Sequence, residues 1–197
     1  MCEHNCGIDH SLEEIPENSL FNQINLVDSE CFNESEENPL KYCIKPYNER
    51  HNSKFLESDI DPELLIKIIF NNFVDINGIK ILSTNEFCPR EVKFFKNNES
   101  LTFDDVGGMK PIHTITPNNN ILTDVIYPLP PSKFSGLEVL YLYIENNLGG
   151  ETTKINYLDF NGKINNLKKK GVVNCVYEVS PQAKKIDSFN EQNMMIS

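Results

Sequence analysis

The fold class is decided by residues 64–81, which read LLIKIIFNNFVDINGIKI. Residues 64–70 form a dense apolar run with many β-branched side chains, which is typical of a strand buried on both faces. Residues 74–77 alternate between apolar and polar side chains, and residues 79–81 alternate again after Gly78. A glycine inside such a pattern indicates a bulge or a turn. The stretch therefore predicts β-structure.

Shorter apolar runs on either side repeat this pattern and are separated by turn residues. We expect further strands over residues 21–26, 92–94, 112–116, 137–144, 155–160 and 172–179. The run 155–160 ends at Asn161-Gly162, a dipeptide typical of tight turns. Long helical periodicity is hard to find, so we expect helix only as a turn or two, near residues 132–134 or in the tails. The fold class predicted is all-β, an antiparallel jelly-roll β-sandwich.

The length of 197 residues fits one domain with tails. Residues 1–19 are polar and acidic, and we interpret them as a flexible N-terminal tail. Residues 181–197 begin with a proline and are interpreted as a C-terminal tail. The folded domain is therefore expected over residues 20–180.

The net charge of −11 is unevenly distributed along the chain. Residues 1–64 hold 15 acidic and 4 basic residues, whereas residues 65–197 hold 14 of each. An acidic chain repels phosphates, so we expect no nucleic-acid partner. The basic run Lys168–Lys170 leaves room for an electrostatic interaction with the acidic first third or with a partner.

No membrane partner is expected, because the longest mainly apolar stretch is far shorter than the roughly 20 residues that a span needs. The N-terminal residues also lack the basic start and apolar centre of a signal peptide. We expect a cytoplasmic protein that can also enter the nucleus, acting as a monomer. Its six cysteines are then expected to be reduced, and the absence of C-x-x-C excludes a thioredoxin-type motif.

The N-terminal segment has one candidate metal site. Its four residues are of types that can bind zinc, namely Cys2, His4, Cys6 and His10. Their spacing is not that of a standard zinc finger, and a flexible tail must lose much entropy to close around a metal. We therefore expect no metal and no cofactor.

Residues 55–63 read FLESDIDPE and form the sharpest polar cluster. Four carboxylates stand there at alternate positions, namely Glu57, Asp59, Asp61 and Glu63. The segment could be an acidic docking edge or a calcium-binding loop, although it lacks the EF-hand pattern. Alternatively, Ser58 and Asp59 hydrogen-bond backbone N–H groups in a turn, or the charges protect a strand edge against aggregation.

No catalytic residues are predicted. The chain has neither a G-x-S-x-G nucleophile motif nor the glycine-rich phosphate-binding motifs. Cys88 or Cys175 could meet His51 or His113 in space, which would allow nucleophilic chemistry. A cysteine without a motif is more often a small buried hydrophobic residue.

Three segments of the chain resemble the PITH domain family, in the same order and at similar spacing. Residues 30–35, ECFNES, resemble its CLNES start, and residues 55–65, FLESDIDPELL, resemble its FLESDxDxELL signature. Residues 151–157, ETTKINY, resemble ETTKIxYxxxxG, with Gly162 as the closing glycine. The resemblance covers roughly residues 20–180 and is to the stand-alone members, because no thioredoxin domain precedes the first motif.

The resemblance has implications for fold and function. It implies a galactose-binding-like β-sandwich, similar to the C-terminal half of thioredoxin-like protein 1, without catalytic residues. It also implies association with the 26S proteasome, whose regulatory particle is the expected partner. We therefore expect a non-enzymatic protein-interaction module, with a carbohydrate- or small-ligand-binding sandwich as the alternative. Fold analogy alone supports that alternative, and the chain has no Trp for a sugar platform.

The motifs supply the candidate partner-binding residues. These are Asn33, Glu34, Ser35, Glu57, Ser58, Asp59, Asp61, Thr152 and Thr153. The same residues could serve the fold alone. Small polar side chains at 33–35 suit a turn fixed by side-chain to backbone hydrogen bonds, and the two threonines can open a strand.

Overall fold

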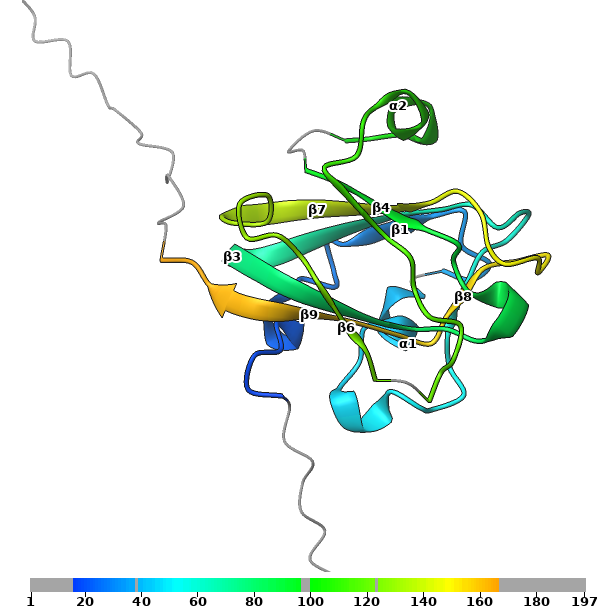
Figure 1. Cartoon of the computed structure of the whole chain (residues 1–197), viewed down its shortest axis with the longest axis horizontal. Coiled ribbons are helices and arrows are strands. Elements are labelled where there is room, and N and C mark those ends of the chain that lie inside the picture. The colour runs from blue at the N-terminus through cyan, green and yellow to red at the C-terminus, as the bar shows by residue number, and fades with distance from the viewer. Residues whose placement is uncertain (1–15, 38, 97–99, 123, 167–197) are drawn as a thin grey trace, which may run out of the picture.

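The computed structural model describes residues 16–37, 39–96, 100–122 and 124–166. The strands are β1 (Glu30–Phe32), β2 (Leu56–Glu57), β3 (Leu64–Leu82), β4 (Val92–Phe95), β5 (His113–Ile115), β6 (Ile126–Pro128), β7 (Leu137–Ile144), β8 (Lys154–Ile155) and β9 (Tyr157–Ile164). The helical segments are α1 (Leu40–Cys43), α2 (Phe103–Gly108) and the 3₁₀ turns η1 (Phe21–Gln23), η2 (Tyr47–Glu49) and η3 (Asn85–Phe87). The strand pairings are antiparallel, so the predicted all-β class with little helix is confirmed (Figure 1).

The long strand β3 is shared by both layers of the sandwich (Figure 1). Its first half pairs with β1 on one side and β7 on the other, with Ile66 opposite both Cys31 and Leu142. Its second half pairs with β9 and with β6, and β7 continues to β4 and β5. One layer therefore has the order β1-β3-β7-β4-β5, and the second half of β3 forms the other layer with β9 and β6.

Bulges allow β3 to bend between the layers. The runs 64–70, 74–77 and 79–81, whose patterns predict β-structure, form one strand of 19 residues. The register shifts between Ile76 and Gly78, so of the two alternatives for this glycine, a bulge or a turn, the bulge is correct. A bulge bends a strand without ending its pairing, which is why the three runs stay continuous.

Three predicted elements differ in the structure. Residues 21–26 form the turn η1 and one isolated bridge instead of a strand, because their apolar side chains are unevenly spaced. Residues 132–134 form a turn and not a helix. Asn161-Gly162 is not a tight turn, since β9 continues through it to Ile164. The glycine is needed there because a Cβ atom would lie 2.1 Å from the carbonyl oxygen of Asp75 on β3.

The core fills the space between the layers, and a smaller cluster covers the outer face of one of them. Ile66 and Ile68 point into the main core, whereas Leu65 packs with Tyr141 and with Val106 of α2 in the smaller cluster. The prediction that residues 64–70 are buried on both faces is therefore confirmed. Burial on both faces explains why this run lacks the alternation of a half-exposed strand.

Some predictions lie outside the described residues. These are the zinc-type residues Cys2, His4, Cys6 and His10, the strand over 172–179, the run Lys168–Lys170 and the C-terminal tail 181–197. Residues 16–19, which the sequence places at the end of the N-terminal tail, contact β9 through a bridge between Ser19 and Asn161. In the described part of the chain, no helix has the length and hydrophobicity required to span a membrane.

Candidate protein-interaction site

All nine predicted partner-binding residues come together at one end of the sandwich, where β2 pairs with β8 (Figure 1). Glu34 forms a bridge with Ser58, and the backbone N–H of Ser58 donates to the carbonyl of Thr153 at 3.0 Å. The cluster consists of Asn33–Ser35, Glu57–Asp61 and Thr152–Thr153, and we call it the motif cluster. Backbone contacts thus join the first segment to the second and the second to the third, the latter two lying about 95 residues apart in sequence.

Asn33 ties the first segment of the motif cluster to the second. Its backbone φ of 66° lies in the left-handed region, which asparagine tolerates better than most residues. Its side-chain amide donates to Asp61 Oδ1 at 2.8 Å and to the carbonyl oxygen of Glu63 at 2.7 Å. Its own carbonyl accepts from the N–H of Asp59 at 2.9 Å. The turn at Asn33 therefore fixes the loop that carries the acidic residues.

Ser58 and Thr153 are buried and join the second segment to the third. The Ser58 Oγ accepts from the N–H of Thr153 at 2.9 Å, and the Thr153 hydroxyl donates to the carbonyl oxygen of Pro62 at 2.7 Å. The Ser58 side chain thus accepts from a backbone N–H group, but from that of Thr153 on a distant segment and not from one within its own turn, as the alternative had it. Because buried polar groups without partners are costly, these bonds contribute to the stability of the loops.

Glu57 is also engaged within the protein. Its Oε1 lies 3.1 Å from Lys154 Nζ and accepts from the Thr152 hydroxyl at 2.7 Å. The ammonium of Lys154 lies over the rings of Phe55 and Phe87, at 4.8 and 4.4 Å from their centroids. Glu57 therefore carries little unpaired charge toward a partner.

The outward surface of the motif cluster consists of the exposed residues Ser35, Asp59, Ile60 and Asp61. Ile60 is 85% exposed and stands between two acidic residues. Asp61 accepts through Oδ1 from Asn33 and from the N–H of Glu63, so part of its hydrogen-bonding capacity is used. Among the described residues, no group of three or more His, Cys, Asp or Glu could hold a metal ion.

A pocket of about 770 Å³ opens beside the motif cluster, and sequence reasoning missed it. It is lined by residues 26–27, 29–34 and 39–41, which belong to a turn, β1 and the start of α1, and we call it the β1 groove. Val27 is 91% exposed and Phe32 is 39% exposed at its surface. Residues 26–41 have no regular apolar spacing, so only the outward Phe32 next to the buried Cys31 could have indicated it.

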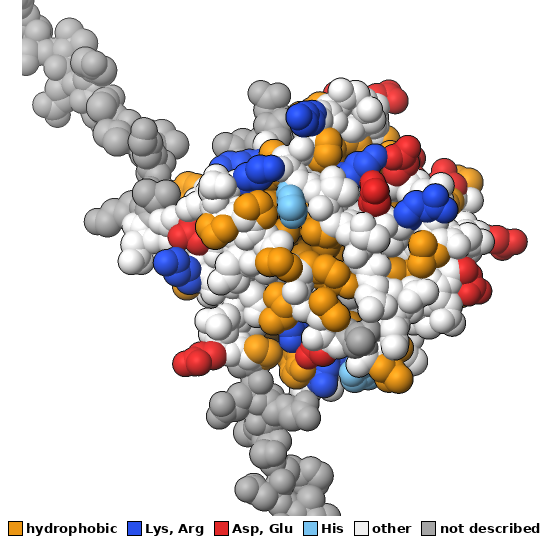
Figure 2. Space-filling model, in the orientation of Figure 1, with side chains coloured by type: hydrophobic (Ala, Val, Ile, Leu, Met, Phe, Trp, Pro, Cys, Tyr) orange, Lys and Arg blue, Asp and Glu red, His pale blue; other side chains and the backbone are white. Residues whose placement is uncertain are grey.

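A second exposed apolar surface lies over β6 (Figure 2). Hydrophobic side chains gather in the middle of this face, and charged side chains lie mostly toward its rim. Ile126 on β6 and the nearby Leu122 are both exposed. Apolar exposure alone therefore does not distinguish the β1 groove, which differs in its hollow shape and in its charge.

The described cysteines are poor nucleophiles. Cys31, Cys43 and Cys88 are free and buried. Burial raises the pKa of Cys31 well above its ordinary value, that of Cys43 to about 12 and that of Cys88 to about 11. Because the reactive form is the thiolate, these thiols are inert near neutral pH.

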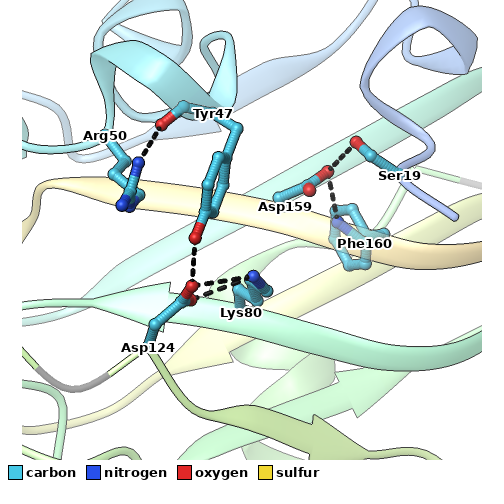
Figure 3. Close-up of polar contacts among 7 residues, drawn as sticks. All are labelled: Ser19, Tyr47, Arg50, Lys80, Asp124, Asp159 and Phe160. Carbon is cyan, nitrogen blue, oxygen red and sulfur yellow. Dashed lines mark hydrogen bonds and ion pairs between the residues drawn. The ribbon is translucent and has the colours of Figure 1, made fainter. Parts of the chain in front are cut away.

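An ion pair between a buried lysine and a partly exposed aspartate lies away from the motif cluster (Figure 3). Lys80 of β3 is 3.0 Å from Asp124, which also accepts a hydrogen bond from the Tyr47 hydroxyl. Burial would raise the pKa of Asp124, but the hydrogen bonds from Tyr47 and Lys80 outweigh it and lower the pKa. The Tyr47 ring stacks against the Arg50 guanidinium at 3.8 Å. Sequence reasoning missed the pair because Lys80 resembles an outward polar position of a half-exposed strand.

Asp159 of β9 has the opposite environment (Figure 3). Its Oδ1 accepts from the Ser19 hydroxyl at 2.9 Å and from the N–H of Phe160 at 2.8 Å. Burial still raises the pKa of this carboxyl above its ordinary value. Asp159 holds residues 16–19 against β9, so it has a structural role in this part of the chain.

A comparison with protein families matches the PITH domain to residues 10–181. The chain belongs to the PITH domain family. It is 36% identical over 180 residues to PITH domain-containing protein CG6153 of Drosophila melanogaster, covering 90% of this chain and 85% of that protein. It is 34% identical over 201 residues to human PITH domain-containing protein 1, covering 98% and 95% respectively.

Solved structures confirm the galactose-binding-like sandwich. This PITH domain is similar to CBM32-3 from a family 31 glycoside hydrolase of Clostridium perfringens, with a TM-score of 0.52 and 17% identity, covering 75% of this chain and 96% of that one. It is also similar to the CBM32-1 and CBM32-2 domains of Clostridium perfringens ZmpB, with a TM-score of 0.52 and 8% identity, covering 82% and 41%. At such low identity the likeness shows the fold alone.

Proposed function

We propose that this PITH domain protein is a non-enzymatic interaction module that associates with the regulatory particle of the 26S proteasome in the cytosol or nucleus. The resemblance to the family supports the choice of partner. The observation that carries the proposal is the motif cluster, in which three distant segments are tied together and present Asp59 and Ile60 outward. A surface fixed before binding loses less conformational entropy on association.

The chemistry of the described residues supports a binding role over a catalytic one. The three described thiols are buried and protonated near neutral pH. Glu57 is occupied by Lys154 and Thr152. A general base or nucleophile needs an accessible group with a suitable pKa, and neither set of side chains offers one.

A protein partner fits the surface better than a sugar does. Phe32 is the one aromatic residue among the large hydrophobic side chains exposed in the described residues, and Asn33 stands next to it. The amide nitrogen of Asn33 already donates to Asp61 and Glu63, so it is engaged where a sugar hydroxyl would need it. An apolar surface with acidic neighbours is better matched to a polypeptide.

The test is retention of purified proteasome regulatory particle on the full-length chain. We expect saturable binding that weakens as the ionic strength rises. Replacement Asp59→Lys should weaken binding and reduce its salt dependence, because the exposed carboxylate acts through long-range attraction. The control Glu17→Lys changes the same charge at another exposed position and should bind like the wild type. Failure of the wild-type chain to retain the particle at physiological ionic strength would refute the proposal.

Asp59 is the informative acidic residue for this test. Reversing the charge of Glu57 breaks its contacts with Lys154 and Thr152, and reversing Asp61 breaks its bond with Asn33. Both changes would alter the loop as well as its charge. Asp59 shares the loop, but its recorded contact is through the backbone N–H, which any residue other than proline keeps.

A further inference from the structure

Strand β1 lies at the edge of its layer. The order of that layer begins with β1, which pairs with β3 along Glu30–Phe32 and, within the described residues, with no other strand. The edge of a sheet offers backbone N–H and C=O groups that can pair with an added strand. Addition of an extended peptide to such an edge is a common mode of recognition. The β1 groove runs beside this edge.

The lining of the β1 groove includes apolar side chains, of which two are accessible. Val27 and Phe32 are exposed, whereas Pro39 and Leu40 line the groove but are buried. Apolar side chains that stay in contact with water on a concave surface favour an apolar ligand group, because burying them releases water. The pocket of about 770 Å³ is large enough for several side chains of a peptide.

The charge around the β1 groove determines which charge of ligand it favours. Residues 26–41 hold one lysine, Lys41, and five carboxylates, namely Asp28, Glu30, Glu34, Glu36 and Glu37. Glu30 is paired with Lys67 at 2.9 Å. Glu30, Glu34 and Lys41 are the charged residues of the lining, and the other three carboxylates flank them in sequence. The segment that forms the groove is therefore net negative, and complementary charge favours a basic partner.

We propose that the β1 groove binds an extended segment of a partner protein. The segment pairs with β1, places an apolar side chain against Val27 and Phe32, and directs Lys or Arg side chains toward the acidic rim. This inference rests on the proposed role as an interaction module and names the surface and the chemistry of the partner. It does not depend on which assembly supplies the segment.

The first test uses a capped nonapeptide of alternating lysine and valine, KVKVKVKVK, titrated into the full-length chain. A matched peptide has glutamate in place of lysine, and another has serine in place of valine. We expect the lysine–valine peptide to bind at least about tenfold more tightly than either. In ¹⁵N-resolved NMR spectra, the amide shifts should be largest over residues 26–34 and 39–41. No binding, equal binding of the three peptides, or shifts centred elsewhere would overturn the proposal.

The second test uses paired variants. Val27→Ser should weaken the lysine–valine peptide about tenfold, because it removes an apolar contact. Leu122→Ser makes the same kind of change at an exposed residue outside the groove and should leave the affinity unchanged. Glu34→Lys should weaken the same peptide, whereas Glu17→Lys should not. Equal effects within either pair would overturn the proposal.

Two further experiments show whether something other than a partner protein occupies the β1 groove. If Val27→Ser abolishes a dimer seen by sedimentation, or if removing residues 167–197 strengthens peptide binding about tenfold, the groove belongs to a second copy or to the chain itself, and the proposal fails. The proteasome assay separates the two proposals. If the regulatory particle binds wild-type and Val27→Ser protein equally, the groove proposal fails for that partner and the proposed function stands. If wild type does not bind the particle, the peptide titrations still decide the groove.

Discussion

The motif cluster and the β1 groove lie side by side and share Asn33 and Glu34, yet they use their polar groups differently. In the motif cluster, the amide of Asn33 and the hydroxyl of Thr153 bond to carbonyl oxygens of the neighbouring loop. In the β1 groove, Val27 and Phe32 remain exposed. The residues that identify the family thus serve mainly to hold the scaffold. The β1 groove, which stays open to a partner, shares residues 30–34 with the first family motif and is otherwise lined by residues outside the three motifs.

Substitutions at residues of the family motifs test whether these residues hold the scaffold. The largest effect is expected for Gly162→Ala, at the closing glycine of the third motif. The added Cβ would lie 2.1 Å from the Asp75 carbonyl oxygen, so β9 must move away from β3. We expect a loss of about 3 kcal/mol in the free energy of unfolding, measured by urea titration.

Gly107→Ala is the matched control for this change. Its Cβ would meet nothing within 4 Å, and alanine has a higher helix propensity within α2. We expect it to be neutral or slightly stabilising. Similar losses for the two variants would mean that the close approach of β9 to β3 is not what requires Gly162.

The next largest effect is expected for Thr153→Val, which keeps the shape of a fully buried side chain and removes its hydroxyl. The carbonyl of Pro62 loses its hydrogen bond, and we expect a loss of about 2 kcal/mol on urea unfolding. Thr114→Val, at an exposed position of β5, should change stability by less than about 0.5 kcal/mol. A residue of the motif cluster outside the groove lining that altered peptide binding in the β1 groove without altering stability would contradict the division described above.

The ion pair in Figure 3 tests whether a network without a motif stabilises the fold in the same way. The pKa of Asp124 is lowered in the folded state, so its ionised form contributes stability above its unfolded pKa. That contribution is lost as the pH falls through the folded pKa. Asp124→Asn should therefore cost about 1 kcal/mol near neutral pH, a small value because the carboxylate is partly exposed, and almost nothing in strong acid.

Asp159→Asn should show the opposite trend with pH. Burial raises the folded pKa of Asp159, so the wild type gains stability as the pH falls and this carboxyl becomes protonated. The variant lacks this gain, so the difference in free energy of unfolding between wild type and variant is least favourable to the variant in acid. Urea titrations across a pH series would measure both trends. Parallel curves for the two variants would show that their environments do not differ as described.

The smallest effect on stability is expected for Val27→Ser. The side chain is 91% exposed, so the free energy of unfolding should change by less than about 0.5 kcal/mol. The same variant should still lose peptide binding. A large loss of stability would place Val27 in the scaffold and remove the contrast between the two regions.

Much of the fold could be predicted because its signals are local. Residues 64–70 are apolar at nearly every position, which indicates burial on both faces before any partner strand is known. Asn161-Gly162 was misread because the dipeptide favours a turn locally, while pairing with β3 keeps the strand extended. Helix α2 was missed, although Thr102 and Asp105 form a capping box that the sequence T-x-x-D could have indicated.

The candidate site was only partly accessible from sequence. The motif cluster was found because its three segments match a family pattern, and its assembly could not be derived from spacing. The β1 groove depends on where α1 packs relative to an edge strand, which is a property of the tertiary structure. Only the outward position of Phe32 beside the inward Cys31 carried a local signal.

The continuity of β3 has a consequence for how the protein opens. A sandwich whose sheets are joined only by loops can release one sheet while the other survives. Here the release of one sheet would also disrupt the other, because both contain β3. Partial opening is therefore not favoured over global unfolding. We therefore expect the protected amides of residues 64–69, which pair with β7, and of residues 79–82, which pair with β9, to exchange with deuterium together, through a single global event.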